Sequence, residues 1–197
     1  TSIKSNNDIE KDVSAYDIGP GNCLIDEWLR KTSDVKFDKD GEIAVTGKLN
    51  QLTLSQAIEN FEISSIQKSL DVKDFDISFA KGLSVEDGCT TITEFTAYLI
   101  SEGLKKIDEI NNMKTNNLIF CGGGRKNKSL IDKIFKFMNN KKLNIMNIDK
   151  FQINGDFIES QAFAYLAIRS YLNLPISFPM TTRCDKASSG GVLIKNF

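Results

Sequence analysis

Histidine is absent from all 197 residues of the chain. Ser-His-Asp triads, Cys-His pairs and histidine-ligated metal sites are therefore excluded within it, and acid–base chemistry must use Asp, Glu, Lys, Tyr or Cys. No apolar run approaches the roughly 18 residues of a membrane-spanning helix. No secretory signal pattern opens the chain either. We therefore expect a cytoplasmic protein without membrane contact.

An excess of charge of either sign is also lacking. The 25 basic and 26 acidic residues give a net charge of −1, whereas nucleic-acid-binding domains usually carry a basic footprint, so no nucleic-acid partner is expected. With 41% hydrophobic and 26% charged residues, the composition is that of a folded globular protein. Arginine is scarce and each copy merits individual inspection: Arg30, Arg125, Arg169 and Arg183.

The cysteines show no metal-binding or redox spacing. Cys23, Cys89, Cys121 and Cys184 are widely scattered, without a CxxC pair. This scatter favours small buried hydrophobic residues in a reducing compartment. A disulfide is not supported, a catalytic cysteine would lack a base partner, and no residue is assigned as a metal ligand.

Apolar periodicity predicts alternating strands and helices. Helices are expected at 22–31, 85–110, 127–139 and 156–171, and the stretch 51–63 could hold a short helix. Strands are expected at 13–17, 118–121, 143–148 and 191–194, with 1–4 and 13–17 forming a hairpin through a turn at 5–8. The helix at 156–171 is apolar on most sides, which predicts that it is buried. This alternation favours an α/β fold.

The first of three glycine-bearing junctions is Tyr16–Asn22, which reads YDIGPGN. Glycines let backbone N–H groups approach a phosphate closely, and the N-terminus of the following helix favours an anion. Asp17 would lie at the carboxyl end of a strand, where it could act as a general base or hold Mg²⁺ through water. Asn22 is the expected N-cap. A tight turn with a surface aspartate is the alternative interpretation.

The second junction, Leu118–Asn127, reads LIFCGGGRKN. Three consecutive glycines each cost about 0.5–1 kcal/mol of conformational entropy relative to alanine, which a mere turn rarely requires. They indicate close approach of a flat or anionic ligand, with a flexible connection as the alternative. The segment matches neither the GxGxxG nor the Walker A pattern.

The third junction, Asn154–Glu159, precedes the helix expected to be buried. Asp156 and Glu159 have the spacing of a capping box, which would explain both carboxylates structurally. The functional alternative is a carboxylate that faces a cleft and accepts hydrogen bonds from sugar hydroxyls.

In this order, the three junctions resemble the anhydro-N-acetylmuramic acid kinase family, of the actin/hexokinase/Hsp70-like ATPase superfamily. The resemblance covers nearly the whole chain from Val13 onward and rests on Tyr16–Asp26, Lys68–Phe75, Thr93–Thr96, Cys121–Leu130 and Gly155–Arg169. Each pattern alone is weak, but together they are specific. They imply an α/β, ribonuclease H-like (actin-like ATPase) lobe with a mixed central sheet flanked by helices.

The resemblance also implies a reaction. Enzymes of this family use ATP and Mg²⁺ to open the 1,6-anhydro ring of anhydro-N-acetylmuramic acid with water and to phosphorylate O6. The product, N-acetylmuramic acid 6-phosphate, belongs to peptidoglycan recycling. Asp17 would take a proton from the attacking water, and Glu159 would contact the amino sugar. The nucleotide would contact Gly19, Gly21 and Asn22 at its phosphates and Gly122, Gly123 and Gly124 at its adenosine, and Asn127 would be a further nucleotide-binding residue.

The sequence departs from the family in what it lacks. Family enzymes have two lobes, and the first-lobe patterns GTSxDG and DFRxxDxAxGGxGAP do not occur here. The chain also starts at Thr1, and Thr181–Cys184 replaces a TGA-like turn. We therefore expect residues 1–197 to be a single C-terminal lobe whose partner is the N-terminal lobe, with a homodimer as a further option.

We expect the isolated chain to be inactive. Two other interpretations stay open. One is a non-catalytic lobe that binds nucleotide or a partner, and the other is a simple α/β interaction domain whose glycine turns are structural.

Overall fold

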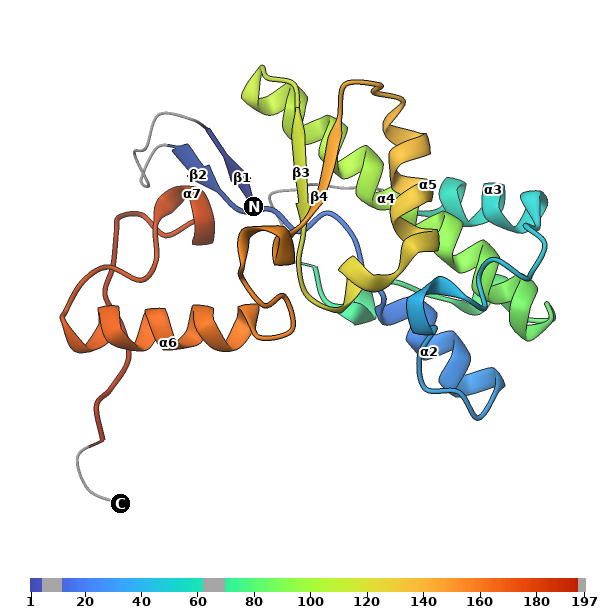
Figure 1. Cartoon of the computed structure of the whole chain (residues 1–197), viewed down its shortest axis with the longest axis horizontal. Coiled ribbons are helices and arrows are strands. Elements are labelled where there is room, and N and C mark those ends of the chain that lie inside the picture. Colours follow the sequence, from blue (N-terminus) through green and yellow to red (C-terminus); the bar gives the residue numbers. More distant parts are fainter. Residues whose placement is uncertain (5–11, 62–69, 195–197) are drawn as a thin grey trace. The chain divides into compact units, whose positions relative to one another are not determined.

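The computed structural model describes residues 1–4, 12–61 and 70–194. Contacts divide the chain into two compact units (Figure 1). The smaller comprises Thr1–Tyr16 and Asp156–Phe197, and the larger comprises Asp17–Gly155. Across the described residues, every helix is too short or too polar to cross a membrane.

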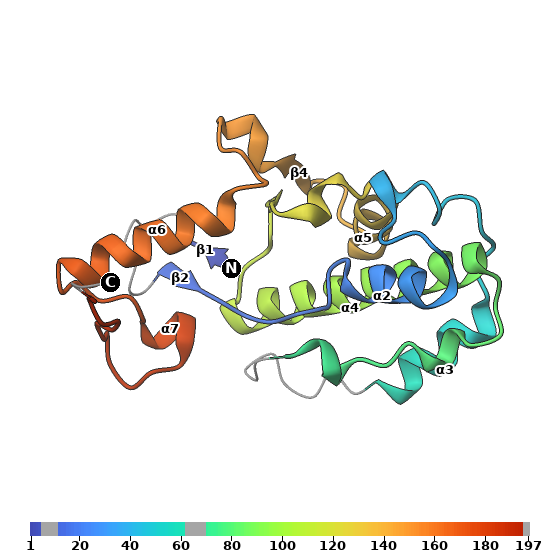
Figure 2. The ribbon, with the colours of Figure 1, turned by 90° about the horizontal axis from the view of Figure 1, so that it is seen from below.

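The larger unit is built around one long helix, α4 (Val85–Asn111). The helix begins where the Ser84 hydroxyl oxygen accepts the Asp87 N–H at 3.1 Å, and it ends at Asn112 in the left-handed conformation. Three further helices pack on it: α2 (Cys23–Thr32), α3 (Gln51–Asn60) and α5 (Lys128–Met138). Figure 2 shows α3 and α5 on opposite sides of α4. The sequence predicted α2, α4 and α5 from apolar periodicity and a short helix within 51–63 that corresponds to α3, and all four are confirmed.

Two apolar clusters hold these helices together. In the first, Leu24, Ile25 and Leu29 of α2 are fully buried against Ile92 and neighbouring residues of α4. In the second, Leu130 and Ile134 of α5 pack with Leu104 of α4. Because α4 contributes to both clusters, it fixes the position of α2 relative to α5.

A parallel strand pair carries the second glycine junction. β3 (Asn117–Phe120) pairs with β4 (Asn144–Asn147), with Asn117 opposite Asn144. Helix α5 is the crossover between the two strands. The strands predicted at 118–121 and 143–148 are confirmed within one residue at each end. Their carboxyl ends lie at the same edge, which is where open α/β sheets bind ligands.

The smaller unit contains an antiparallel pair and two helices. β1 (Ser2–Ile3) pairs with β2 (Val13–Ser14), followed much later by α6 (Ile158–Tyr171) and α7 (Pro179–Thr182). The hairpin is confirmed with a shorter second strand than expected, and its predicted turn at 5–8 lies outside the described residues. The mixed α/β class is confirmed, but in place of one central sheet the described residues form two separate two-stranded sheets, one in each unit.

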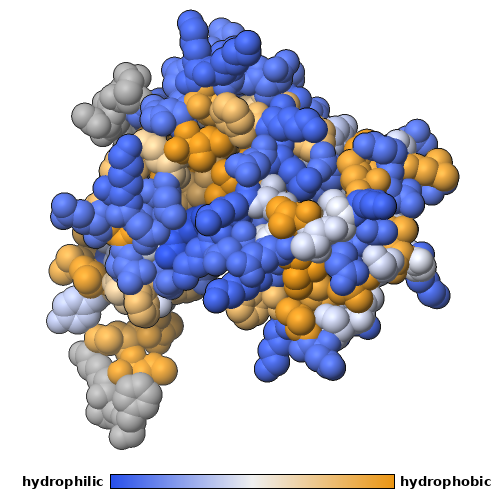
Figure 3. Space-filling view, turned by 45° about the vertical axis from the view of Figure 1, so that its right-hand side comes forward, coloured by the Kyte–Doolittle hydropathy of each residue, from blue (hydrophilic) through white to orange (hydrophobic). Residues whose placement is uncertain are grey.

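Helix α6 corrects one prediction. None of its residues is buried, and Phe163 and Tyr171 are 71% and 69% exposed. The strands and the short α7 beside it in this unit are too small to cover a helix that is apolar on most sides. Hydrophobic side chains also reach the surface on the face drawn in Figure 3.

Two further predictions are wrong. Residues 191–194 form no strand. Gly191 has a φ of 93°, which is incompatible with an extended strand. Just before it, the Gly190 carbonyl oxygen accepts a hydrogen bond from the Ser170 hydroxyl. Burial holds for Cys89 but not for Cys121, which is exposed, and all four cysteines are free thiols.

Candidate functional site

The second glycine turn follows β3 directly. Gly122 adopts φ 67° and ψ −170°, a region that is essentially restricted to glycine. The 3₁₀-helix η4 (Gly123–Lys126) comes next. Asn127 then caps α5, because its Oδ1 accepts the Leu130 N–H at 3.0 Å. The turn therefore ends at a capped helix N-terminus, a position that favours anions.

The first glycine turn carries the predicted base. Asp17 is exposed, and its Oδ2 accepts the Leu70 N–H at 3.1 Å. Gly21, with a φ of 59°, turns the chain into α2. Asn22 occupies the N-cap position as predicted, but its side chain makes no cap hydrogen bond.

The Asn22 side chain instead joins the two turns. Its Oδ1 accepts a hydrogen bond from Asn127 Nδ2 at 3.2 Å. Asn127 thus uses one amide atom to cap α5 and the other to hold the first turn. The structure therefore brings together two junctions that lie about a hundred residues apart in the sequence.

Of the glycines predicted to contact the nucleotide, only one is explained by a lack of room for a side chain. A Cβ at Gly19 would lie 2.7 Å from Ile100 Cγ1 of α4, so packing requires glycine there. At Gly122, Gly123 or Gly124, an added Cβ would meet no atom of the described residues within 4 Å. Of these three, Gly122 alone has a positive φ. Neither the backbone nor the packing therefore explains Gly123 and Gly124, whose open face lets a ligand reach the main chain.

Burial shifts the pKa of two ionisable groups at the start of α2. Burial raises the pKa of the Cys23 thiol, and a thiol with a raised pKa is mostly neutral and weakly nucleophilic at pH 7. Burial also raises the pKa of the Asp26 carboxyl, although Arg30 acts in the opposite direction. Asp17 differs from both groups in being exposed beside the first turn.

Glu159 lies in the smaller unit, in the first turn of α6, and is exposed. The predicted capping box is wrong, because Phe157 occupies the N-cap position of α6 and makes no side-chain cap bond. The helix begins at Ile158, so Asp156 lies one residue too early to serve as the cap. The spacing of Asp156 and Glu159 therefore does not reflect a capping box.

Arg183 has a clear local role. It ends α7 with a φ of 63°, and its Nη2 donates to the Ala15 carbonyl oxygen at 2.9 Å. Its guanidinium carbon lies 5.1 Å from the centre of the Tyr16 ring, within cation–π range. Arg183 therefore fixes the residues that immediately precede Asp17 in the chain.

Sequence reasoning missed one ion pair at the second turn. Arg125 and Asp149 form it, with 2.6 Å between Nε and Oδ2. The rarity of arginine was a signal for Arg125. Asp149 follows β4 in an ordinary polar segment, and nothing in its position along the sequence indicated that it would pair with Arg125.

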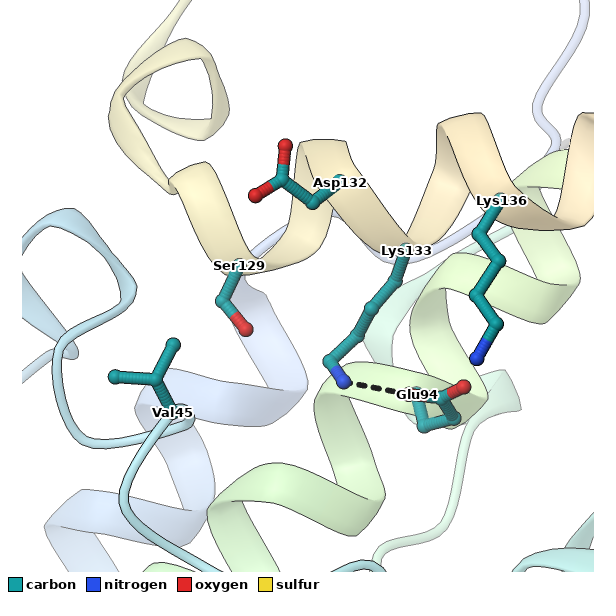
Figure 4. A pocket seen from close by; sticks show the side chains of 6 residues that line it. All are labelled: Val45, Glu94, Ser129, Asp132, Lys133 and Lys136. Atoms are coloured by element: carbon teal, nitrogen blue, oxygen red, sulfur yellow. Dashed lines mark hydrogen bonds and ion pairs between the residues drawn. The ribbon is translucent and has the colours of Figure 1, made fainter.

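A separate pocket of about 260 Å³ lies between α4 and α5 (Figure 4). Its floor holds a second ion pair, in which Lys133 Nζ lies 2.6 Å from Glu94 Oε2. The charges of its two lysines and two carboxylates cancel, so it favours neither anions nor cations. Its lining residues are Val45, Glu94, Ser129, Asp132, Lys133 and Lys136. The part of the chain that the structure describes holds no cluster of three or more Cys, Asp or Glu side chains able to bind a metal.

Comparison with known proteins shows the family to which the chain belongs. The family model of anhydro-N-acetylmuramic acid kinase matches residues 5–196. The chain belongs to this family. The resemblance carried by the three glycine junctions is thereby confirmed.

Curated anhydro-N-acetylmuramic acid kinases from several bacteria match nearly the whole chain. That of Pelagibacter ubique is 49% identical over 99% of the chain. Those of Zymomonas mobilis and Brucella canis are 36% and 34% identical, each over 92% of the chain. The matched regions make up 52%, 48% and 48% of the respective relatives, so the chain spans about half of their length.

Proposed function

We propose that residues 1–197 form the C-terminal lobe of an ATP-dependent kinase acting on anhydro-N-acetylmuramic acid. The enzyme would open the 1,6-anhydro ring and phosphorylate O6, giving N-acetylmuramic acid 6-phosphate for peptidoglycan recycling in the cytoplasm. Family membership supports this reaction class. The length of the relatives supports an N-terminal lobe that supplies the rest of the nucleotide and sugar contacts.

The observation that carries the nucleotide part of this proposal is the open face of Gly123 and Gly124. Both are glycine without a conformational or packing reason, and a bound nucleotide supplies one. The turn lies at the carboxyl edge of β3 and is tied through Asn127 to the turn that follows Asp17. Gly21 and Asn22 would then lie beside the phosphates, and Gly122–Gly124 beside the adenosine.

In the proposed reaction, hydrolysis and transfer are one coupled event. Asp17 takes a proton from water, whose oxygen attacks C1 of the sugar. The C1–O6 bond breaks, and O6 attacks the γ-phosphorus as the bond to the β-phosphate oxygen breaks, which releases ADP. The Leu70 N–H orients the Asp17 carboxylate. Most of the acceleration comes from positioning and charge stabilisation, and Glu159 would hold the sugar.

Magnesium fits this site as a partner of the nucleotide. Mg²⁺ is commonly bound by one or two carboxylates together with substrate phosphates and waters. Asp17 is a carboxylate of this kind, and it could hold the ion through water. When bound, Mg²⁺ supplies charge neutralisation of the phosphates.

The substitution Asp17→Asn tests the catalytic assignment in the full-length protein that contains this chain. Asparagine keeps an oxygen that can accept the Leu70 N–H but cannot act as a base at neutral pH. We expect kcat to fall by about 10²- to 10⁴-fold, the usual contribution of a general base, with ATP affinity nearly unchanged. Turnover is followed by ADP release and ATP affinity by calorimetry.

Asp34→Asn is the matched control, since Asp34 is an exposed aspartate in the loop after α2. Its activity should equal that of the wild type. Full activity of Asp17→Asn would remove Asp17 from the base role. A wild-type protein that binds ATP without turnover would instead support the non-catalytic lobe.

A further inference from the structure

A buried arginine is hydrogen-bonded to the second glycine turn. The Arg125 side chain is only 4% exposed and pairs with Asp149 of η5 (Ile148–Phe151). Its Nε donates to Asp149 Oδ2 at 2.6 Å, and its Nη1 donates to the carbonyl oxygen of Gly122 at 3.0 Å. One guanidinium therefore binds both the turn itself and the segment after β4.

The hydrogen bonds form a closed ring. Asp149 Oδ1 accepts the Gly155 N–H at 3.0 Å, and the Gly155 carbonyl oxygen accepts the Gly122 N–H at 3.2 Å. Starting from Gly122, the ring runs through Arg125, Asp149 and Gly155 and returns to Gly122. Both polar backbone groups of Gly122 are therefore fixed.

Packing reinforces this ring at Gly155. The residue is buried, and an added Cβ would overlap the Arg125 side chain, with Cδ and Cζ each 2.7 Å away. Glycine at this position therefore leaves room for the guanidinium. The glycine of the third junction, Gly155, is therefore explained by its close packing against Arg125 of the second junction.

The ring matters because the turn is otherwise intrinsically mobile. Three successive glycines have access to many backbone conformations, and a ligand that binds one of them must bear the cost of selecting it. Restraints that hold the bound conformation in advance remove that cost and raise affinity. Lysine could not replace Arg125, because its ammonium lacks the planar fork that reaches two acceptors at once.

We propose that Arg125 and Asp149 are positioning residues that hold the Gly122–Gly124 turn in the conformation that receives ATP. This inference rests on the proposed nucleotide role of the turn. The pair itself does not touch the nucleotide and acts through the backbone of Gly122. Its loss therefore affects ATP binding more than phosphoryl transfer from bound ATP.

The test compares Arg125→Lys with wild type in the full-length protein. We expect KM for ATP to rise about tenfold, equivalent to the loss of roughly 1.4 kcal/mol of binding. The value of kcat at saturating ATP and KM for the anhydro sugar should stay within about threefold, because the groups proposed to react are untouched. Hydrogen exchange at the Gly122 and Gly155 amides should accelerate. Arg30→Lys makes the same change at an exposed arginine of α2 and should leave all four readouts unchanged.

The outcomes separate this inference from the proposed function. Faster amide exchange with an unchanged KM for ATP would overturn the positioning role while leaving the kinase assignment intact. A fall in kcat together with a rise in KM for both ATP and the sugar would mean general destabilisation and would likewise overturn it. Absence of ATP turnover in the wild-type protein would contradict the proposed function itself.

Discussion

Gly122 and Gly123 are adjacent residues that are glycine for different reasons. The first has backbone angles that other residues rarely adopt, whereas the second lies in a 3₁₀-helix with open space where a Cβ would project. Stability and ligand binding should therefore respond differently to alanine at the two positions.

We expect Gly122→Ala to lower the free energy of unfolding by about 1–3 kcal/mol, the usual cost of a strained backbone conformation. Gly123→Ala should leave stability unchanged or raise it by about 0.4–1 kcal/mol, since alanine restricts the unfolded chain. It should nevertheless weaken ATP binding, because the methyl group occupies the open face. Chemical denaturation and calorimetric titration with ATP measure the two effects. Unchanged ATP affinity in a folded Gly123→Ala protein would contradict the ligand role of this face.

Individual side chains mark the limit of what the sequence could predict. Asn22 was correctly placed at the start of a helix, but its hydrogen bond goes to Asn127, far along the chain. The closed ring around Arg125 likewise depends on Gly155 and Asp149 arriving beside the turn. Local patterns indicate where a residue lies along an element, whereas partners from distant segments are set by packing.

Helices α4 and α5 are joined by a charged pair as well as by apolar packing. The Glu94 side chain is 8% exposed, and that of Lys133 is 22% exposed. Replacing Lys133 alone leaves a buried carboxylate without its cation.

We expect Lys133→Met to lower the free energy of unfolding by roughly 2–4 kcal/mol, somewhat less than for a fully buried pair because water reaches Lys133. Adding Glu94→Gln should restore much of this loss, because no buried charge remains. Lys105→Met is the control, since Lys105 forms a pair with Glu102 on α4 that is more exposed than the Lys133–Glu94 pair and is worth at most about 1 kcal/mol. Denaturation curves provide all these values. A double variant less stable than Lys133→Met would contradict this account.

Helix prediction succeeded where amphipathic periodicity was strong and failed where context decided. The apolar spacing of 85–110 corresponds to α4, whose apolar residues fill both clusters of the larger unit. The apolar composition of 156–171 correctly predicted a helix but wrongly predicted burial. Burial requires a neighbouring surface, and composition does not indicate whether the rest of a unit supplies one.

The whole molecule contains one side of the proposed site. It has both glycine turns and Asp17 but spans about half the length of its relatives. The isolated 197-residue chain should therefore show no measurable phosphorylation of anhydro-N-acetylmuramic acid with ATP and Mg²⁺. The full-length protein is the positive control, and phosphate transfer from labelled ATP is the measurement. Turnover by the chain alone at ordinary enzyme rates, about 1–10³ s⁻¹, would contradict the need for a second lobe.

For the molecule as a whole, the sequence indicated the family but not the division of the chain into two compact units. The combined junction patterns pointed to the kinase family, which the family model confirms. No linker composition marks Tyr16 or Gly155, where the two compact units meet along the chain. Such a division arises from the distribution of tertiary contacts, which has no local sequence signature.

The hydrogen bond between Asn22 and Asn127 has a consequence for how the protein is made. The two residues are 105 positions apart, and ribosomes add roughly 5–20 residues per second. The first turn therefore emerges roughly 5–20 s before its partner exists. During that interval α2 can form, but the turn after Asp17 must wait for α5 to be synthesised. The side of the larger unit that we propose faces the nucleotide is thus completed only late in the synthesis of that unit.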